Sequence, residues 1–383
     1  MVSAAVLPKN AKPTSENAMK ATPDQPVGQN PFIKASRERT LIGPTKSEVG
    51  FGASAIQTEV LDVPAGGFLR YLVMEVTATG GAGAATAKED APFSVIDQFT
   101  LSDVNGNALI GPMNGYHLYL MEKYGGYTWG GDAKLRPSYS ALSTSNGNFA
   151  FTLRIPIEIS GRDGYGALAN MDASQTFKVQ WITAGTSAVY ASGPATTVPD
   201  LTVKFGVEIW DYPPPTDARG VANQQFPPAH GTTQYWKSTT YDLQSGEVTQ
   251  RLARVGNNIR NLILVYRVSS ARSTTNFPDP VRFQIDDQAF DLLTRSRLRD
   301  RMYDLYGYTG TSDAAGALDT GVFVWNFDHD LDGRPGYSNR LGLLHTHQGT
   351  KLELIGSTGA AGVLTVLTND IAVPAGNELV GRL

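Results

Sequence analysis

Apolar and polar side chains alternate along most of the chain beyond residue 55, and glycines and prolines separate the alternating runs. Alternation with a period of two is typical of β-strands that bury one face. The runs at 149–159 and 322–331 are clear examples. Because strands do not alternate regularly with helical patterns, a parallel α/β sheet is disfavoured and the pattern predicts antiparallel sheets.

Two segments instead place their apolar residues at helical spacing. Tyr116, Leu120 and Tyr124 lie four residues apart, and Asn114 before them is a candidate N-cap. The same spacing recurs at residues 298, 302 and 306. We therefore predict one helix near 114–124 and a second near 294–306.

The predicted elements occur twice in the same order. The segments 61–66, 72–76, 99–103, 116–124, 149–165, 176–179 and 201–203 find counterparts, in order, at 241–246, 264–268, 283–287, 298–306, 322–337, 350–352 and 364–366. The offset between counterparts changes only between elements, which is the effect of loops of different length. The chain is therefore predicted to contain two copies of one β-rich unit.

A proline-rich stretch separates the two copies, running from Pro213 to Pro228. Proline favours a stiff, extended connector. We predict a first sandwich at 55–212, a connector at 213–235 and a second sandwich at 236–383. About eight short strands with one inserted helix fit a jelly roll, so the predicted fold is all-β with a few short helices, as two tandem eight-stranded jelly-roll sandwiches.

Residues 1–54 differ from the rest, because six prolines interrupt every potential helix or strand and few large apolar residues are present. Residues 1–50 carry seven basic and four acidic side chains, a balance of +3, which leaves −7 for the remainder of a chain of net charge −4. We interpret 1–54 as an extended N-terminal arm. It is either a solvated tail or a segment ordered by a neighbouring subunit or an acidic surface.

Composition excludes several classes of protein. With 383 residues, 41% of them hydrophobic, the chain can build a large core and is not a disordered polymer. A net charge of −4 lacks the basic footprint of a protein that coats nucleic acid, so no sequence-specific nucleic-acid partner is expected. The absence of cysteine excludes disulfides, thiolate metal sites and a cysteine nucleophile. No stretch approaches the length of apolar sequence that spans a bilayer.

Few residues are candidates for chemistry. Asp328, Asp330 and Asp332, followed by a glycine, form the start of a calcium loop, but the full loop would place a glutamate where Asn339 stands. We expect solvated carboxylates at the end of a strand, with calcium as the alternative. No catalytic residues and no cofactor-binding loop are apparent, and the chain is expected not to be an enzyme.

These features together resemble the double jelly-roll major capsid proteins of tailless icosahedral double-stranded DNA viruses, especially bacteriophages with an internal membrane. The resemblance covers residues 55–383 and rests on the repeat, the inserted helices and the proline-rich joint. It implies a pseudo-hexagonal homotrimer that contacts neighbouring capsomers and vertex or penton proteins, with the arm running beneath toward a membrane. It also implies location in the virion, and in the host cytoplasm before assembly.

A different class of protein stays open at this point. A carbohydrate-binding or carbohydrate-cleaving β-sandwich, such as a phage spike or vertex component, would use tryptophans and tyrosines on one face and, for cleavage, a pair of carboxylates at fixed separation. The five tryptophans are interpreted as core or interface residues, with sugar stacking as the alternative.

Overall fold

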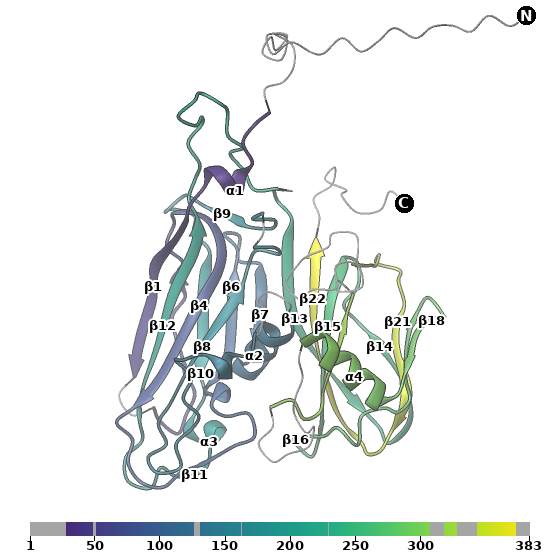
Figure 1. Ribbon diagram of the computed structural model, residues 1–383. Coiled ribbons are helices and arrows are strands. Elements are labelled where there is room, and N and C mark those ends of the chain that lie inside the picture. Colours follow the sequence, from purple (N-terminus) through teal and green to yellow (C-terminus); the bar gives the residue numbers. More distant parts are fainter. Residues whose placement is uncertain are drawn as a thin grey trace, which may run out of the picture.

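The computed structural model describes residues 28–48, 51–125, 131–161, 163–228, 230–306, 318–327 and 343–372. Two β-sandwiches lie side by side, and the helices α2 (Gly115–Tyr124) and α4 (Arg295–Tyr306) each accompany one of them (Figure 1). Both helices lie where the sequence predicts them. Asn114 caps α2, because its side chain accepts a hydrogen bond of 2.8 Å from the His117 backbone N–H.

The first sandwich consists of two antiparallel sheets. One has the order β1 (Glu38–Glu48), β12 (Asp200–Trp210), β4 (Gly67–Thr79), β8 (Phe149–Pro156). The facing sheet has the order β2 (Ile56–Gln57) with β3 (Leu61–Asp62), then β10 (Lys178–Thr183), β6 (Ile96–Ser102), β7 (Ala108–Met113). Each sheet thus mixes strands from the beginning, middle and end of the unit, as a jelly roll does.

The second sandwich repeats this topology. One sheet has the order β13 (Thr233–Leu243), β22 (Gly362–Ala372), β15 (Asn258–Val268), β19 (Val322–Asn326). The facing sheet has the order β14 (Gly246–Leu252), β21 (Leu352–Thr358), β17 (Val281–Ile285), β18 (Gln288–Leu293). The predicted fold of two tandem jelly rolls is confirmed.

Shorter elements decorate the two units. They are α1 (Phe32–Ala35), β5 (Thr86–Ala87), η1 (Phe93–Val95), η2 (Ala133–Leu135), β9 (Leu168–Asn170), α3 (Thr186–Val189), β11 (Tyr190–Ser192), β16 (Ala271–Arg272) and β20 (Leu344–His345). Helix α1 and the C-terminal end of β22 lie at one end of the strands, and α3, β11 and β16 lie at the other (Figure 1).

The first sandwich begins earlier than the sequence indicates. Strand β1 pairs with β12 from Glu38 opposite Trp210 to Glu48 opposite Leu201, although these residues fall in the expected arm of 1–54. Gly43 and Pro44 interrupt the apolar pattern, and the register shifts between Ile42 and Thr45. Proline is compatible with an edge strand or a bulge, and β1 has both, so its sequence resembles that of a loop.

The match of segment 61–66 with 241–246 is wrong, because β1 falls in the expected arm and its place in the repeat is given to a later segment. Segment 61–66 runs from β3 toward β4, whereas its expected counterpart 241–246 runs from the end of β13 into β14. The true counterpart of β13 is β1, because each is the first strand of its unit and pairs with the last. The segment between the sandwiches spans residues 211–232, and β13 begins three residues before the expected start at 236.

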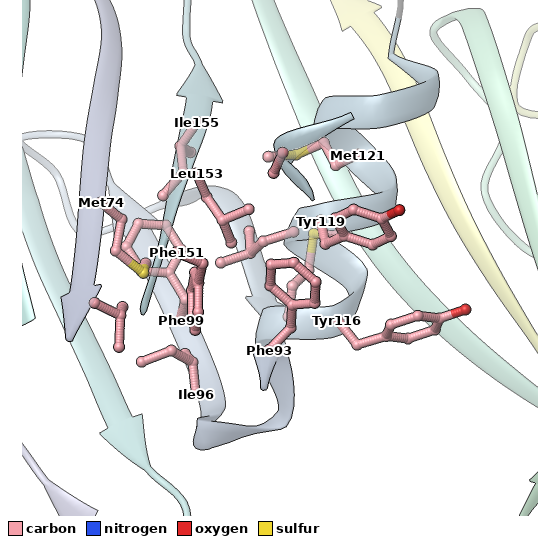
Figure 2. Packing of buried hydrophobic residues seen from close by; sticks show 14 of the residues in the cluster. Met74, Phe93, Ile96, Phe99, Tyr116, Tyr119, Met121, Phe151, Leu153 and Ile155 are labelled. Carbon is pink, nitrogen blue, oxygen red and sulfur yellow. The ribbon is translucent and has the colours of Figure 1, made fainter. Parts of the chain in front are cut away.

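Each sandwich is filled by the inward faces of its strands. In the first, alternate residues of β8 are buried and meet η1 and α2; Figure 2 shows Phe93, Phe99 and Phe151 among them. The rings of Phe93 and Phe151 lie 4.8 Å apart. A second cluster around Phe283 and Trp325 fills the other sandwich. The period of two in the sequence therefore corresponds to burial of one face.

Candidate functional site

Asp328, Asp330 and Asp332 lie outside the described residues. Within the described ranges no group of three or more histidines and acids is placed to hold a metal ion. His345 Nδ1 lies 2.9 Å from Asn258 Oδ1, and His347 Nδ1 accepts a hydrogen bond from its own loop at Gly349.

No helix in the described ranges is both long enough and apolar enough to cross a membrane.

An extensive arrangement of buried polar groups lies at the joint between the two sandwiches. Trp236 of β13 pairs in parallel with Ile110 of β7, which joins one sheet of each sandwich into a continuous sheet. Trp236 has no exposed surface. The ammonium of the next residue, Lys237, donates hydrogen bonds to the carbonyl oxygens of Ala108 at 2.6 Å and Gly111 at 2.9 Å. Burial lowers the pKa of Lys237.

Helix α2 belongs to the first sandwich but also covers the second. The Tyr116 hydroxyl donates to the carbonyl oxygen of Leu318 at 2.6 Å. Asp319 receives the Lys123 ammonium at 2.8 Å and the Tyr124 hydroxyl at 2.7 Å. Burial raises the pKa of Tyr116, so its hydroxyl keeps its proton.

A second group of charges closes the joint at the other side of Tyr116. Arg267 donates to Asp90 at 2.7 Å, and the Arg272 backbone N–H donates to Glu89 at 3.0 Å. Desolvation opposes the charge of the buried Arg272, but Tyr116, Asp90 and Glu89 outweigh it and raise its pKa overall. These pairs connect acids of the first sandwich to arginines of the second, and the fully buried Arg272 guanidinium depends on them for its compensating charge.

The base of the N-terminal segment is anchored on its own chain. Phe32 of α1 is buried, with its ring 5.3 Å from that of Phe68 and 6.4 Å from that of Trp210, both at edge-on angles. Asn30 donates to Asn223 in the segment between the sandwiches at 2.8 Å. Contacts within the chain therefore hold residues 30–36 in place.

An ion-pair network lies beside this anchor. Arg70 contacts Glu158 and Glu38, each at 3.0 Å, and its guanidinium lies 4.1 Å from the centre of the Trp210 ring. The indole N–H of Trp210 donates to Glu158 at 3.0 Å. Burial raises the pKa of Glu158 despite the nearby guanidinium. The network ties the start of β1 to the core of the first sandwich.

The two strands at the far ends of the molecule carry exposed apolar side chains. Strand β1 lies at the outer edge of the first sandwich and β18 at the outer edge of the second (Figure 1). Ile42 on β1 is 90% exposed, and on β18 Phe290 is 49% and Leu292 60% exposed. Each strand has a sheet neighbour on one side only among the described residues. Apolar side chains on open edges mark surfaces for association.

The sequence marks the joint by a difference between the two helices, which comparison of the repeats alone does not reveal. In α2 every residue except Lys123 is buried, and apolar residues occur around the whole helix. In α4 only Leu298 and Met302 are buried, and the rest is mostly charged. A helix that is apolar all round is covered on all sides. Comparing the two helices predicts which of them is covered by both sandwiches.

The topology and the joint define a class: the chain is a double jelly roll. Solved viral capsid proteins have this fold. The chain is similar to the major capsid protein of STIV, the Sulfolobus turreted icosahedral virus, with a TM-score of 0.62 and 13% identity over 91% of this chain and 100% of that chain. It is also similar to VP54 of PBCV-1, with a TM-score of 0.59 and 11% identity over 92% of this chain and 96% of that chain.

A third similar structure is the major capsid protein P2 of bacteriophage PM2, with a TM-score of 0.50 and 11% identity over 89% of this chain and 99% of that chain. No protein-family model and no curated protein matches the sequence. The likeness therefore lies in the fold, and it extends over nearly the whole of both chains.

Proposed function

We propose that this protein is the major capsid protein of an icosahedral virus, which assembles as a trimer into the shell of the virion. The observation that carries the proposal is the fusion of two equivalent sandwiches by a buried, ion-paired joint. A closed ring of three such chains contains six equivalent units, so a trimer has a six-sided outline that can tile a surface. The outer edge of the trimer would then contact neighbouring capsomers and vertex proteins.

The two ends of the strands differ in a way that suggests an orientation. Helix α1 and the C-terminal end of β22 lie at the same end of the strands (Figure 1). We expect this end to face the interior of the shell. A basic segment gains about 1 kcal/mol per charge near an anionic membrane. Screening by salt reduces this gain, so contacts with other subunits supply most of the ordering.

The proposed role is structural and includes no catalytic step. The buried acids and bases described above are paired across the joint or at the arm anchor, so they hold the chain together rather than face a substrate cleft. The carbohydrate-active alternative makes a different prediction. Turnover of a polysaccharide by the purified protein, lost on replacement of acids on one sheet, would support that alternative and contradict the structural role.

The test of the proposal is the mass and shape of the protein in solution. Sedimentation or native mass spectrometry should give three times the mass of the chain, and electron micrographs should show six-sided particles. Removal of residues 1–27 leaves Phe32 and β1 in place, so the truncated protein should stay trimeric but assemble poorly into shells. A stable monomer at high concentration, or normal shells from the truncated chain, would contradict the respective part of the proposal.

A further inference from the structure

We propose that the contact between neighbouring copies repeats the joint inside the chain, with β18 of one copy packed on β1 of the next and Gln288 opposite Ile42. The inference rests on the proposed trimer and adds the surface that forms it. Inside the chain, strand β7 packs on the first strand of the next unit, β13, and helix α2, which follows β7, contacts β15. Strands β18 and β1 are the counterparts that lack such a neighbour among the described residues.

The hydrogen-bond register identifies the counterpart of Trp236. Trp236 pairs with Asn369 in β22, and Ile42 pairs with Gly206 in β12. Gly206 and Asn369 are 163 positions apart, as are Leu201 and Leu364, which begin the matching segments of these two strands. Ile42 therefore occupies in the first sandwich the place that Trp236 occupies in the second.

The register also identifies the counterpart of Ile110. Ile110 pairs with Leu101 in β6, and Gln288 pairs with Ile285 in β17. Leu101 and Ile285 are 184 positions apart, as are Phe99 and Phe283 in the same two strands. If the contact between copies repeats the joint, Gln288 stands opposite Ile42 as Ile110 stands opposite Trp236.

Burial differs between the joint and its free counterparts in the direction that the proposal requires. Trp236 is fully buried and Ile42 is 90% exposed. On β7 most residues are buried, whereas the first three residues of β18 are exposed. The contrast between the covered α2 and the charged, exposed α4 has the same direction. A second copy would cover β1 and β18 in the way that the joint already covers their counterparts β13 and β7.

The surface of the second sandwich is hollowed between β18 and α4. The hollow has a volume of about 260 Å³, and charges of both signs line it together with Leu293, from Asp291, Arg297, Asp300, Arg301 and Asp304. Strand β1 also presents both signs, including the exposed Glu38 and Lys46. A contact of this kind is heterologous, because it joins two different surfaces, and it closes only as a ring. The partner is therefore a further copy of the chain, and three copies close the ring.

The chain contains no cysteine, so introduced cysteines report the contact without background. In the variant Ile42→Cys/Gln288→Cys, paired strands would bring the two thiols of neighbouring copies within disulfide reach, about 4.4–6.8 Å between Cα atoms. Mild oxidation with oxidised glutathione should give linked dimers and linked trimers on a non-reducing gel. The matched control Val60→Cys/Gln288→Cys, at a residue 58% exposed on the first sandwich, should stay unlinked.

Single variants sharpen the result. Ile42→Cys alone and Gln288→Cys alone should stay unlinked, whereas a mixture of the two should give linked dimers and no linked trimer. Linking of Ile42→Cys to itself would show a two-fold contact between equal surfaces and would overturn the inference. Absence of linking in a double variant that sediments as a trimer would overturn it too, while leaving the proposed capsid function intact.

A charge substitution tests the same contact without covalent cross-linking. Ile42→Asp should raise the protein concentration at which half of the protein is trimeric by at least tenfold, as measured by sedimentation. Val60→Asp should leave this concentration unchanged. The circular dichroism spectrum of each variant verifies that the monomer is folded. A trimeric Ile42→Asp variant would overturn the inference, and a monomeric unaltered protein would overturn the inference and the proposed trimer together.

Discussion

Replacing Trp236 with alanine should measure how strongly the two sandwiches are coupled. A tryptophan buries on the order of 200 Å², and at about 25 cal/mol per Å² its removal forfeits about 5 kcal/mol. Partial collapse of the cavity reduces the loss, so we expect the free energy of unfolding to fall by about 3–5 kcal/mol. That is a large part of the stability of a typical folded protein. Guanidinium unfolding followed by circular dichroism is the assay, at one fixed protein concentration.

A double-mutant cycle assigns the loss to the joint. Ile110 lies opposite Trp236 on the other sandwich, so Trp236→Ala and Ile110→Ala should be non-additive by more than about 0.5 kcal/mol. Phe283→Ala, in the separate core of the second sandwich, should add to Trp236→Ala within that margin. Tyr212→Ala, at a half-exposed ring, serves as the surface control. A loss below about 1 kcal/mol for Trp236→Ala, or additivity with Ile110→Ala, would refute the coupling.

Three further outcomes follow from buried groups. Phe32→Ala should cost about 3–5 kcal/mol and open the anchor to protease, which gel electrophoresis detects. Asp319→Ala should cost a similar amount, because it leaves the Lys123 ammonium short of a buried partner, whereas Lys123→Met/Asp319→Leu should cost less. Burial lowers the pKa of His117 to about 3. The unfolded chain then binds the extra proton below about pH 6.5, so stability should fall between pH 6.5 and 3, and less steeply in His117→Gln than in the exposed control His345→Gln.

The strands with one clearly buried face were predictable from the sequence, and the open edge was not. Alternation in β8 and β12 follows directly from burial of every second residue. Strand β1 has no such alternation, because in the single chain few of its side chains are covered and a bulge interrupts it at Ile42. If β1 packs on another copy as proposed, its pattern is one that only the assembly explains.

The polar contacts of the joint also lay beyond the sequence. The pairs of Asp319 with Lys123 and of Asp90 with Arg267 join residues almost two hundred positions apart, and no short motif marks them. Their partners are set by how the two sandwiches meet. The helix α2 was nevertheless identifiable as an unusual element, since its glutamate and lysine occur late in an otherwise apolar helix. Sequence therefore predicted the element at the joint but not its chemistry.

The fusion of two sandwiches through residues 211–232 has a kinetic consequence. A ring of six separate sandwiches would form through five successive encounters between independent molecules, whereas three double chains need only two. Within the chain the second sandwich meets the first at an effective concentration on the order of millimolar, set by the tether and not by the amount of protein in the cell. In the proposed ring of three chains, half of the contacts between sandwiches would therefore form during folding, and dilution could affect only the other half.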